Sequence, residues 1–130
     1  MEKTPYEKNR KEGQPLVMRG RELFRMAVSQ STKDIKTVLA KAGMQPSDIT
    51  YYLMHQANKR IIESIRTLLG EPEEKFPTNI ENYGNTSSAS IPILLDEMLA
   101  AGKIHNGDIL LMSAFGAGFV SAVCILEWGK

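Results

Sequence analysis

Three features of the sequence carry residue types that could do chemistry. His55 directly follows the apolar stretch "YYLM", and Asn85 lies within "NYGNTSSAS" (82–90). The third feature, "FGAGF" (115–119), separates two apolar runs. Histidine and asparagine both donate hydrogen bonds, and glycine lets a ligand approach the backbone because it has no Cβ. Two neutral donors directed at one point would form a site that stabilises an oxyanion or an enolate.

Each feature also has a simpler interpretation. A lone histidine at the end of a strand is more often structural or exposed than catalytic, and an asparagine beside a glycine is more often a turn residue than a ligand. The segment "GAG" (116–118) between two strands is most simply a tight hairpin. The combination is harder to explain in this way, because together the three supply two side-chain donors and an accessible backbone.

A helix is predicted to begin shortly after His55, and this bears on the charge of the imidazole. The partial positive charge at a helix N-terminus disfavours a protonated ring. His55 would then be neutral and would donate a hydrogen bond to developing negative charge. No nucleophile accompanies it, because Cys124, the only cysteine, lies in the apolar run 119–128. Burial raises the pKa of a thiol and makes it inert, so we expect Cys124 to belong to the core.

The spacing of apolar residues predicts the elements that must position these groups. Two helical stripes each end at a glycine in the position of a C-terminal cap. The first consists of Phe24, Ala27, Val28, Ser31, Ile35, Val38, Leu39 and Ala42 before Gly43, and the second of Ile61, Ile62, Ile65, Leu68 and Leu69 before Gly70. The composition of 14–18, 48–54 and 76–80 predicts three strands, the last at a sheet edge or strand start because it contains a proline.

A third helix and two final strands complete the predicted order. The helix has its apolar stripe at Ile91, Leu94, Leu95, Met98 and Leu99. Its small first turns, "TSSAS" (86–90), indicate close approach to another backbone and a buried position. The runs 109–115 and 119–128 are predicted to be strands buried on both faces. The order β-α-β-α-β-α-β-β is typical of a layered α/β domain with a mixed sheet, whose sites lie at the carboxyl ends of the strands.

Composition limits the class of protein. The chain has 130 residues, enough for one domain with a real core, and residues 1–14 are polar and predicted to be irregular. A formal net charge of +1 argues against binding nucleic acid or a membrane through bulk charge. We find no apolar run of transmembrane length, no signal peptide and no cysteine pair. These observations favour a soluble, cytoplasmic protein.

The motifs "HQANKRI" (55–61), "YGNTSSASIP" (83–92) and "FGAGF" (115–119) resemble, in this order, the C-terminal half of β-ketoacyl-acyl-carrier-protein synthase III. The resemblance runs from about "VMRGRELFRMAV" (17–28) to the end of the chain. It implies half of a thiolase-like fold, with all of 1–130 forming the C-terminal domain. The family starts fatty-acid synthesis by decarboxylative Claisen condensation of an acyl-CoA primer with malonyl-acyl-carrier-protein. Related condensing enzymes of the chalcone-synthase or hydroxymethylglutaryl-CoA-synthase type are the alternative, and "GNTSSAS" (84–90) favours the bacterial fatty-acid type.

The resemblance implies a role for each matching residue. His55 and Asn85 match the residues that stabilise the enolate oxygen during decarboxylation, and the loop Gly116, Ala117 and Gly118 matches the one whose backbone amide helps to form the oxyanion hole. Positions along the pantetheine tunnel are matched by Gly20, Phe24, Ala57 and Asn58, although core packing explains Phe24 equally well. The sites that dock acyl carrier protein are matched by Arg25 and Arg60, with Arg66 as a neighbour, although solvated helix faces carry such arginines routinely. The resemblance implies no metal and no cofactor, because CoA thioesters serve as substrates.

One part of the family pattern has no match in this sequence. The catalytic cysteine of the family lies in its N-terminal half, which the resemblance does not cover. We therefore expect no condensation by this chain alone. The start "MEKTPYEKNR" favours a fragment or truncated product. The alternatives are a subunit of a split synthase completed by a cysteine-bearing chain, and a noncatalytic module that binds CoA or carrier protein. Because half of such a fold exposes an apolar face, we also expect a homo-oligomer or association with the cysteine-bearing half.

Overall fold

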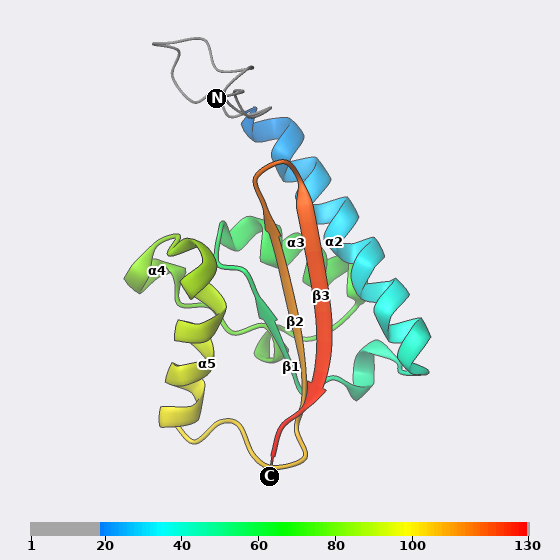
Figure 1. The fold of residues 1–130 in the computed structure, drawn as a ribbon, viewed down its shortest axis with the longest axis vertical. Helices are drawn as coiled ribbons and strands as arrows, with labels where there is room; N and C mark the ends of the chain where they lie inside the picture. The colour runs from blue at the N-terminus through cyan, green and yellow to red at the C-terminus, as the bar shows by residue number, and fades with distance from the viewer. Residues whose placement is uncertain (1–18, 130) are drawn as a thin grey trace, which may run out of the picture.

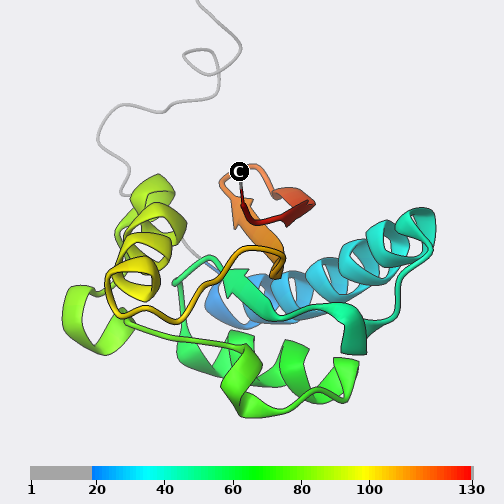
Figure 2. The same cartoon turned by 90° about the horizontal axis from the view of Figure 1, so that it is seen from below.

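The computed structural model describes residues 19–129, which form a three-stranded sheet with helices on both faces (Figures 1 and 2). The predicted strand at 14–18 and the irregular segment 1–14 lie outside the described residues. The helices and strands are α2 (Gly20–Ala42), β1 (Tyr51–Met54), α3 (Lys59–Leu69), α4 (Ile80–Tyr83), α5 (Ser90–Ala100), β2 (Ile109–Gly116) and β3 (Val120–Glu127). Short 3₁₀ turns occupy Pro46–Asp48, Glu73–Lys75 and Ser87–Ala89.

The sheet is mixed, as the sequence predicts, with the strand order β1-β2-β3. Strand β1 runs parallel to β2, with Met54 opposite Ser113, whereas β3 returns antiparallel to β2. The carboxyl ends of β1 and β2 therefore meet at one edge of the sheet. The residues after β1 and the loop after β2 lie at that edge, as expected for a site in an α/β domain.

Two apolar layers enclose the sheet. On one face, α2 and α3 pack against each other and against buried residues that include Tyr52 and Leu111. On the other face, α5 packs beside β1, where Leu53 and Leu110 are buried with Leu94 and Met98 of the helix (Figure 1). Alternate residues of β1 and β2 enter opposite layers, because side chains of a strand point to opposite faces in turn.

The two predicted helical stripes form α2 and α3. Gly43 and Gly70 cap these helices with φ of 67° and 72°, in the left-handed region where glycine has no steric cost. Most of both stripes is buried or half-buried, but Ala42 is exposed and the Leu68 side chain is 55% exposed. The prediction that these two residues belong to the buried stripes is therefore wrong.

The predicted strand at 76–80 does not form. The side chain of Phe76 instead stacks on the ring of Tyr52, with ring centroids 4.4 Å apart. Pro77 has no N–H to contribute to a sheet. The amide of Asn79 donates to the Gln56 side chain (3.2 Å), and α4 begins at the next residue. The apolar character of this segment thus serves packing against β1 rather than strand pairing. At the other predicted strand, 48–54, only Tyr51–Met54 is extended.

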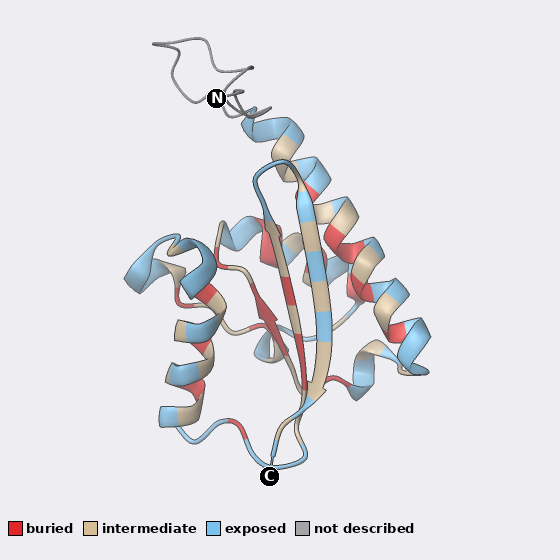
Figure 3. Cartoon of the chain, in the orientation of Figure 1, coloured by how far each residue is buried: buried red, intermediate tan, exposed pale blue. Residues whose placement is uncertain are grey.

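Strand β3 is far less buried than the sequence predicts. Its residues alternate between exposed and half-buried (Figure 3), because α2 covers one face and α5 lies on the other face beside β1 instead. Val120 is 68% exposed, and Cys124 is exposed as well. The prediction that Cys124 is a buried core thiol is therefore wrong for this chain. The small turns before α5 are exposed too, at Ser87, Ser88 and Ala89, so the expected burial of this helix is limited to one face.

Candidate active site

His55 lies at the carboxyl end of the parallel pair β1–β2. Its backbone N–H donates to the carbonyl of Ser113 in β2 (2.8 Å), which continues the strand pairing by one residue. Its imidazole meets the ring of Phe115 edge-on, with centroids 5.4 Å apart and planes at 74°. Phe115 directly precedes the glycine loop 116–118. The structure therefore brings together two of the three predicted features, His55 and this loop.

The imidazole is held from its other side by α5. Nδ1 of His55 lies 2.7 Å from Oγ of Ser90, the first residue of that helix. Burial lowers the pKa of His55, so the neutral ring is favoured, as the sequence predicts. The predicted cause was the start of the following helix, α3. Burial of the imidazole is instead the cause of the lowered pKa. The helix start that contacts the ring is that of α5, at Ser90.

Asn85 is positioned by an unusual backbone rather than by a strand. It follows α4, and the expectation that it follows a strand at 76–80 is wrong. Gly84 adopts φ 66° and ψ −158°, a combination open almost only to glycine. Ser87 has φ 56°, and its amide donates to Oδ1 of Asn85 (2.9 Å). The Asn85 oxygen is thus engaged by the backbone, which leaves its exposed amide group Nδ2 as the donor.

The glycine loop joins β2 to β3 in a hairpin, as its simplest interpretation predicts. Gly118 has φ 76° and Phe119 has φ 50°, so two successive residues adopt left-handed backbone. Such a conformation is uncommon for phenylalanine and marks a constrained turn. The Phe119 ring stacks on Phe115 at 6.4 Å. Gly116, Ala117 and Gly118 are exposed, so their backbone is accessible beside His55.

A buried side chain, Gln56, ties these parts together, and the sequence reasoning missed it. Its amide nitrogen donates to the carbonyl of Met54 (2.8 Å), and its oxygen accepts from the backbone of Asn79 (3.2 Å). Asn79 in turn donates to Glu97 of α5 (2.8 Å), as does the hydroxyl of Tyr83 (2.6 Å). This network connects the end of β1 to the segment that carries Asn85. No local signal marks Gln56 as buried, because it stands in the mostly polar run "HQANKR" (55–60).

The residues matched to the pantetheine tunnel lie along the starts of α2 and α3. Phe24 is half-buried, and the guanidinium of Arg60 lies 5.7 Å from the centre of its ring. Asn58 is the N-cap of α3, where its Oδ1 accepts from the amide of Arg60 (2.9 Å). Capping is thus a structural function of Asn58, and its amide group stays exposed. Gly20 is exposed and Ala57 is half-buried.

The three arginines matched to carrier-protein docking differ in their surroundings. Arg25 and Arg60 are exposed on α2 and α3. Arg66, near the end of α3, is half-buried and donates to the carbonyl of Glu71 (3.2 Å). Arg60 contacts α2, because its guanidinium lies over the ring of Phe24. Arg66 makes its hydrogen bond to Glu71, just after its own helix.

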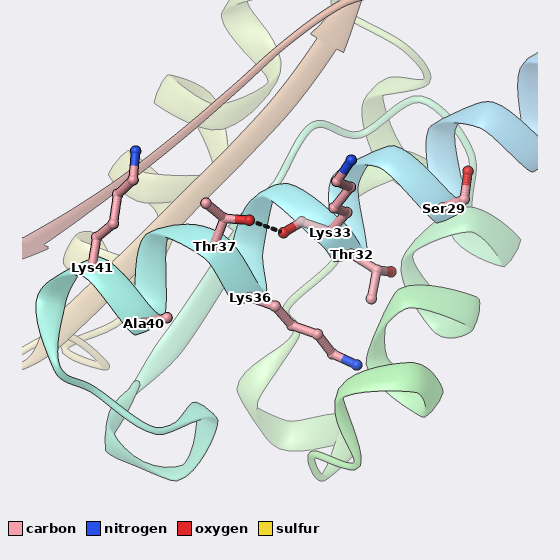
Figure 4. A pocket seen from close by; sticks show the side chains of 7 residues that line it. All are labelled: Ser29, Thr32, Lys33, Lys36, Thr37, Ala40 and Lys41. Atoms are coloured by element: carbon pink, nitrogen blue, oxygen red, sulfur yellow. Dashed lines mark hydrogen bonds between the residues drawn. The ribbon is translucent and has the colours of Figure 1, made fainter.

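A groove of 660 Å³ runs along α2 and does not coincide with these residues (Figure 4). Three lysines line it, Lys33, Lys36 and Lys41, together with Ser29, Thr32, Thr37 and Ala40. The hydroxyl of Thr37 is engaged within the helix, where it donates to the carbonyl of Lys33 (2.8 Å). The groove is a shallow surface of one helix, and it contains none of the predicted site residues.

The family of the chain follows from comparison with known proteins. Residues 39–128 match the family model described as "3-Oxoacyl-[acyl-carrier-protein (ACP)] synthase III C terminal". The chain belongs to this family. The matched range of the synthase III C-terminal family includes His55, Asn85 and the glycine loop, whereas Gly20, Phe24 and Arg25 precede it. The predicted family is therefore confirmed.

Relatives extend the similarity over most of the chain. It is 49% identical over 115 residues to the β-ketoacyl-[acyl-carrier-protein] synthase III of Geobacillus kaustophilus, which covers 88% of this chain and 37% of the relative. The corresponding enzyme of Synechocystis is 44% identical, with 88% and 35% covered. The crystal structure of the synthase III from Aquifex aeolicus superimposes with a TM-score of 0.84 at 44% identity, covering 86% of this chain and 36% of that one. The thiolase-like fold is confirmed, and the chain spans little more than a third of the length of these relatives.

Two further observations concern the described residues alone. None of their helices combines the length and the apolar character needed to cross a membrane. Between residues 19 and 129, no group of three or more histidine, cysteine, aspartate or glutamate side chains is arranged to hold a metal ion.

Proposed function

We propose that this chain supplies the C-terminal part of a 3-oxoacyl-[acyl-carrier-protein] synthase III, in which His55 and Asn85 serve decarboxylation. The observation that carries the proposal is the convergence of the His55 ring and the glycine loop at one edge of the sheet, in a chain of the synthase III C-terminal family. The exposed Nδ2 of Asn85 provides a second donor on the neighbouring segment.

The proposed chemistry begins with a malonyl thioester. Its terminal carboxylate leaves as carbon dioxide, and the electron pair of the broken C–C bond passes to the thioester oxygen as an enolate. Hydrogen bonds from neutral His55 and from Asn85 stabilise that negative charge, and a neutral imidazole is suited to donate without itself losing a full proton. The enolate carbon then attacks an acyl-cysteine thioester, whose carbonyl oxygen is held by the backbone amide of Ala117. The cysteine thiolate leaves as the new C–C bond forms.

The nucleophilic cysteine of this scheme comes from another part of the enzyme. We propose that the chain associates with a cysteine-bearing N-terminal half, or with a second copy of itself, through the uncovered face of β3. Exposed apolar Val120 on that strand supports such association, because soluble monomers rarely leave large apolar faces open. Light scattering of the isolated chain checks association with a second copy, and a strictly monomeric species at all concentrations contradicts that association.

We propose that the exposed surface of α2 and α3 near His55 binds acyl carrier protein and the CoA thioester. Arg25 and Arg60, with Arg66, would attract an acidic carrier protein, because charge complementarity guides such encounters. Gly20, Phe24, Ala57 and Asn58 would line the path of the pantetheine arm. The contact between Arg60 and Phe24 supports a continuous surface from the docking residues to the tunnel residues.

A chimaera tests the proposed function. The C-terminal segment of the Geobacillus kaustophilus synthase, which is 49% identical, is replaced by this chain, so that the relative supplies its own N-terminal part. We expect condensation of acetyl-CoA with malonyl-acyl-carrier-protein, and a loss of about 10²–10³ in decarboxylation on His55→Ala or Asn85→Ala. His105→Ala is the matched control, because His105 is exposed on the loop before β2. A folded, active chimaera whose rate is unchanged by His55→Ala would refute the role of His55.

A further inference from the structure

The hydroxyl of Ser90 lies between two groups of the segment that follows β1. Its Oγ is 2.7 Å from Nδ1 of His55 and 3.3 Å from the backbone nitrogen of Gln56. Ser90 is only 2% exposed, so no bulk water competes for these contacts. It comes from α5, 35 positions further along the chain than His55. A residue so distant in sequence and so well buried fixes the ring relative to the helix.

Counting protons assigns the direction of each hydrogen bond. The backbone N–H of Gln56 can only donate, so Oγ of Ser90 accepts there. The hydroxyl carries one proton of its own, and within residues 19–129 the remaining partner of Oγ is Nδ1 of His55. If Ser90 donates its proton to Nδ1, both contacts are satisfied and Nδ1 carries no proton.

The opposite arrangement leaves a buried proton without an acceptor. If Nδ1 carried a proton and donated it to Oγ, the oxygen would accept twice, from His55 and from Gln56. The hydroxyl proton of Ser90 would then have no partner in a buried place, which costs the full desolvation of that group. The first arrangement is therefore the stable one. A neutral imidazole has one N–H, so its proton must reside on Nε2.

We propose that Ser90 is a positioning residue that holds neutral His55 in the tautomer with its proton on Nε2. This geometry makes Nε2, the nitrogen on the opposite side of the ring from α5, the donating atom of the site. The edge-on contact with Phe115 restrains rotation of the same ring. Fixing a histidine tautomer through a bond to its other nitrogen is a general device for preparing the ring for one role. The tautomer assignment stands on the contacts alone, whereas its use in stabilising an enolate rests on the proposed function.

Nuclear magnetic resonance of the imidazole nitrogens tests the tautomer without any catalysis. The chain is labelled with ¹⁵N in its histidine rings and carries His105→Gln, so that only the His55 ring is observed. We expect Nδ1 to show the shift of an unprotonated nitrogen and Nε2 that of a protonated one, at a pH where the ring is neutral. A protonated Nδ1 in this chain would overturn the proposal at once, whatever the variants do.

Three variants separate the hydroxyl of Ser90 from the packing around it. Ser90→Ala removes the hydroxyl, and we expect both nitrogen shifts to move toward the average of two tautomers. Ser90→Thr keeps a hydroxyl and should keep the Nε2–H form. Ser88→Ala, two residues earlier on an exposed turn, is the matched control and should leave the shifts unchanged. If the shifts of a folded Ser90→Ala chain equal those of the unaltered chain, the hydroxyl does not select the tautomer.

The chimaera described above gives the catalytic consequence. In it, Ser90→Ala should lower kcat about tenfold or more with little change in KM, because the site still binds substrate but presents a mixed population of rings. Ser90→Thr should restore kcat. A chimaera that is inactive even without the variant, combined with the expected nitrogen shifts, would count against the proposed function and still support the tautomer assignment. An active chimaera with unchanged kcat on Ser90→Ala would contradict the positioning role.

Discussion

Replacing Gln56 with leucine should loosen the segment that carries Asn85 from the strand that carries His55. Gln56 is 1% exposed, and its side chain makes two hydrogen bonds to backbone groups on different segments. The side-chain nitrogen of Gln56 donates to the carbonyl of Met54 in β1. Its side-chain oxygen accepts from the backbone N–H of Asn79, just before α4. Leucine fills a similar volume and can make neither bond.

The expected loss in the free energy of unfolding is estimated from the two hydrogen bonds that the variant lacks. The amide of Asn79, in a residue that is only 5% exposed, loses the acceptor it has in the structure, which costs about 1–3 kcal/mol. Loss of the bond to the Met54 carbonyl adds about 0.5–1.5 kcal/mol. Burying leucine in place of a polar amide offsets part of this sum. We therefore expect Gln56→Leu to lower the free energy of unfolding by about 2 kcal/mol.

Urea unfolding, followed by circular dichroism, measures the global loss, and amide hydrogen exchange locates it. The amide of Asn79 should exchange at least about tenfold faster in the variant, since about 1.4 kcal/mol corresponds to one factor of ten. Gln30→Leu is the control, because half-buried Gln30 makes a single bond within α2, to Asp34 one turn later (2.8 Å), and such pairs are worth about 0.5 kcal/mol or less. If Gln56→Leu unfolds within about 0.5 kcal/mol of the unaltered chain while the Asn79 amide stays protected, the reasoning is refuted.

Two further predictions concern the backbone and the charge of the site. Gly84→Ala should destabilise the chain by about 1–3 kcal/mol in urea unfolding, because φ at this position is positive. Gly116→Ala is the control, because a Cβ there also meets open space but φ is not positive, and it should change the free energy of unfolding by about 0.5 kcal/mol or less. Equal losses of unfolding free energy in the two variants would contradict the role of the positive φ. Since burial lowers the pKa of folded His55 below 6.5, the unfolded chain binds more protons in the window between the two values. The free energy of unfolding should therefore rise with pH through that window and level off above it, and a His55→Gln chain that shows the same rise would exclude His55 as its source.

Local signals in the sequence were sufficient for much of the fold. The helices α2 and α3 follow from apolar spacing and from the terminal glycines Gly43 and Gly70, because both the stripe and the cap are encoded within a few residues. The hairpin around "GAG" (116–118) is local in the same way. His55 and this loop could be placed at one edge because parallel strands bring their carboxyl ends together.

The errors concern interactions between distant segments. Phe76 and Pro77 have the composition of a short strand, but Tyr52 offers the Phe76 ring a stacking partner that no local pattern reveals. In the sequence Ser90 is only one of several small residues in "TSSAS" (86–90), and its contact with His55 spans 35 positions, so no local pattern reveals it. Burial of β3 was overestimated because a strand's apolar content does not say which of its faces another layer covers.

The exposure of Cys124 changes how acyl transfer to this chain must be judged. A thiol open to solvent can take an acyl group from a CoA thioester and release free CoA by simple exchange, with no active site involved. A chain labelled by radioactive acetyl-CoA would thus resemble an acyl-enzyme. A Cys124→Ser chain removes this background, so only acylation that persists in it can be assigned to an enzymatic nucleophile.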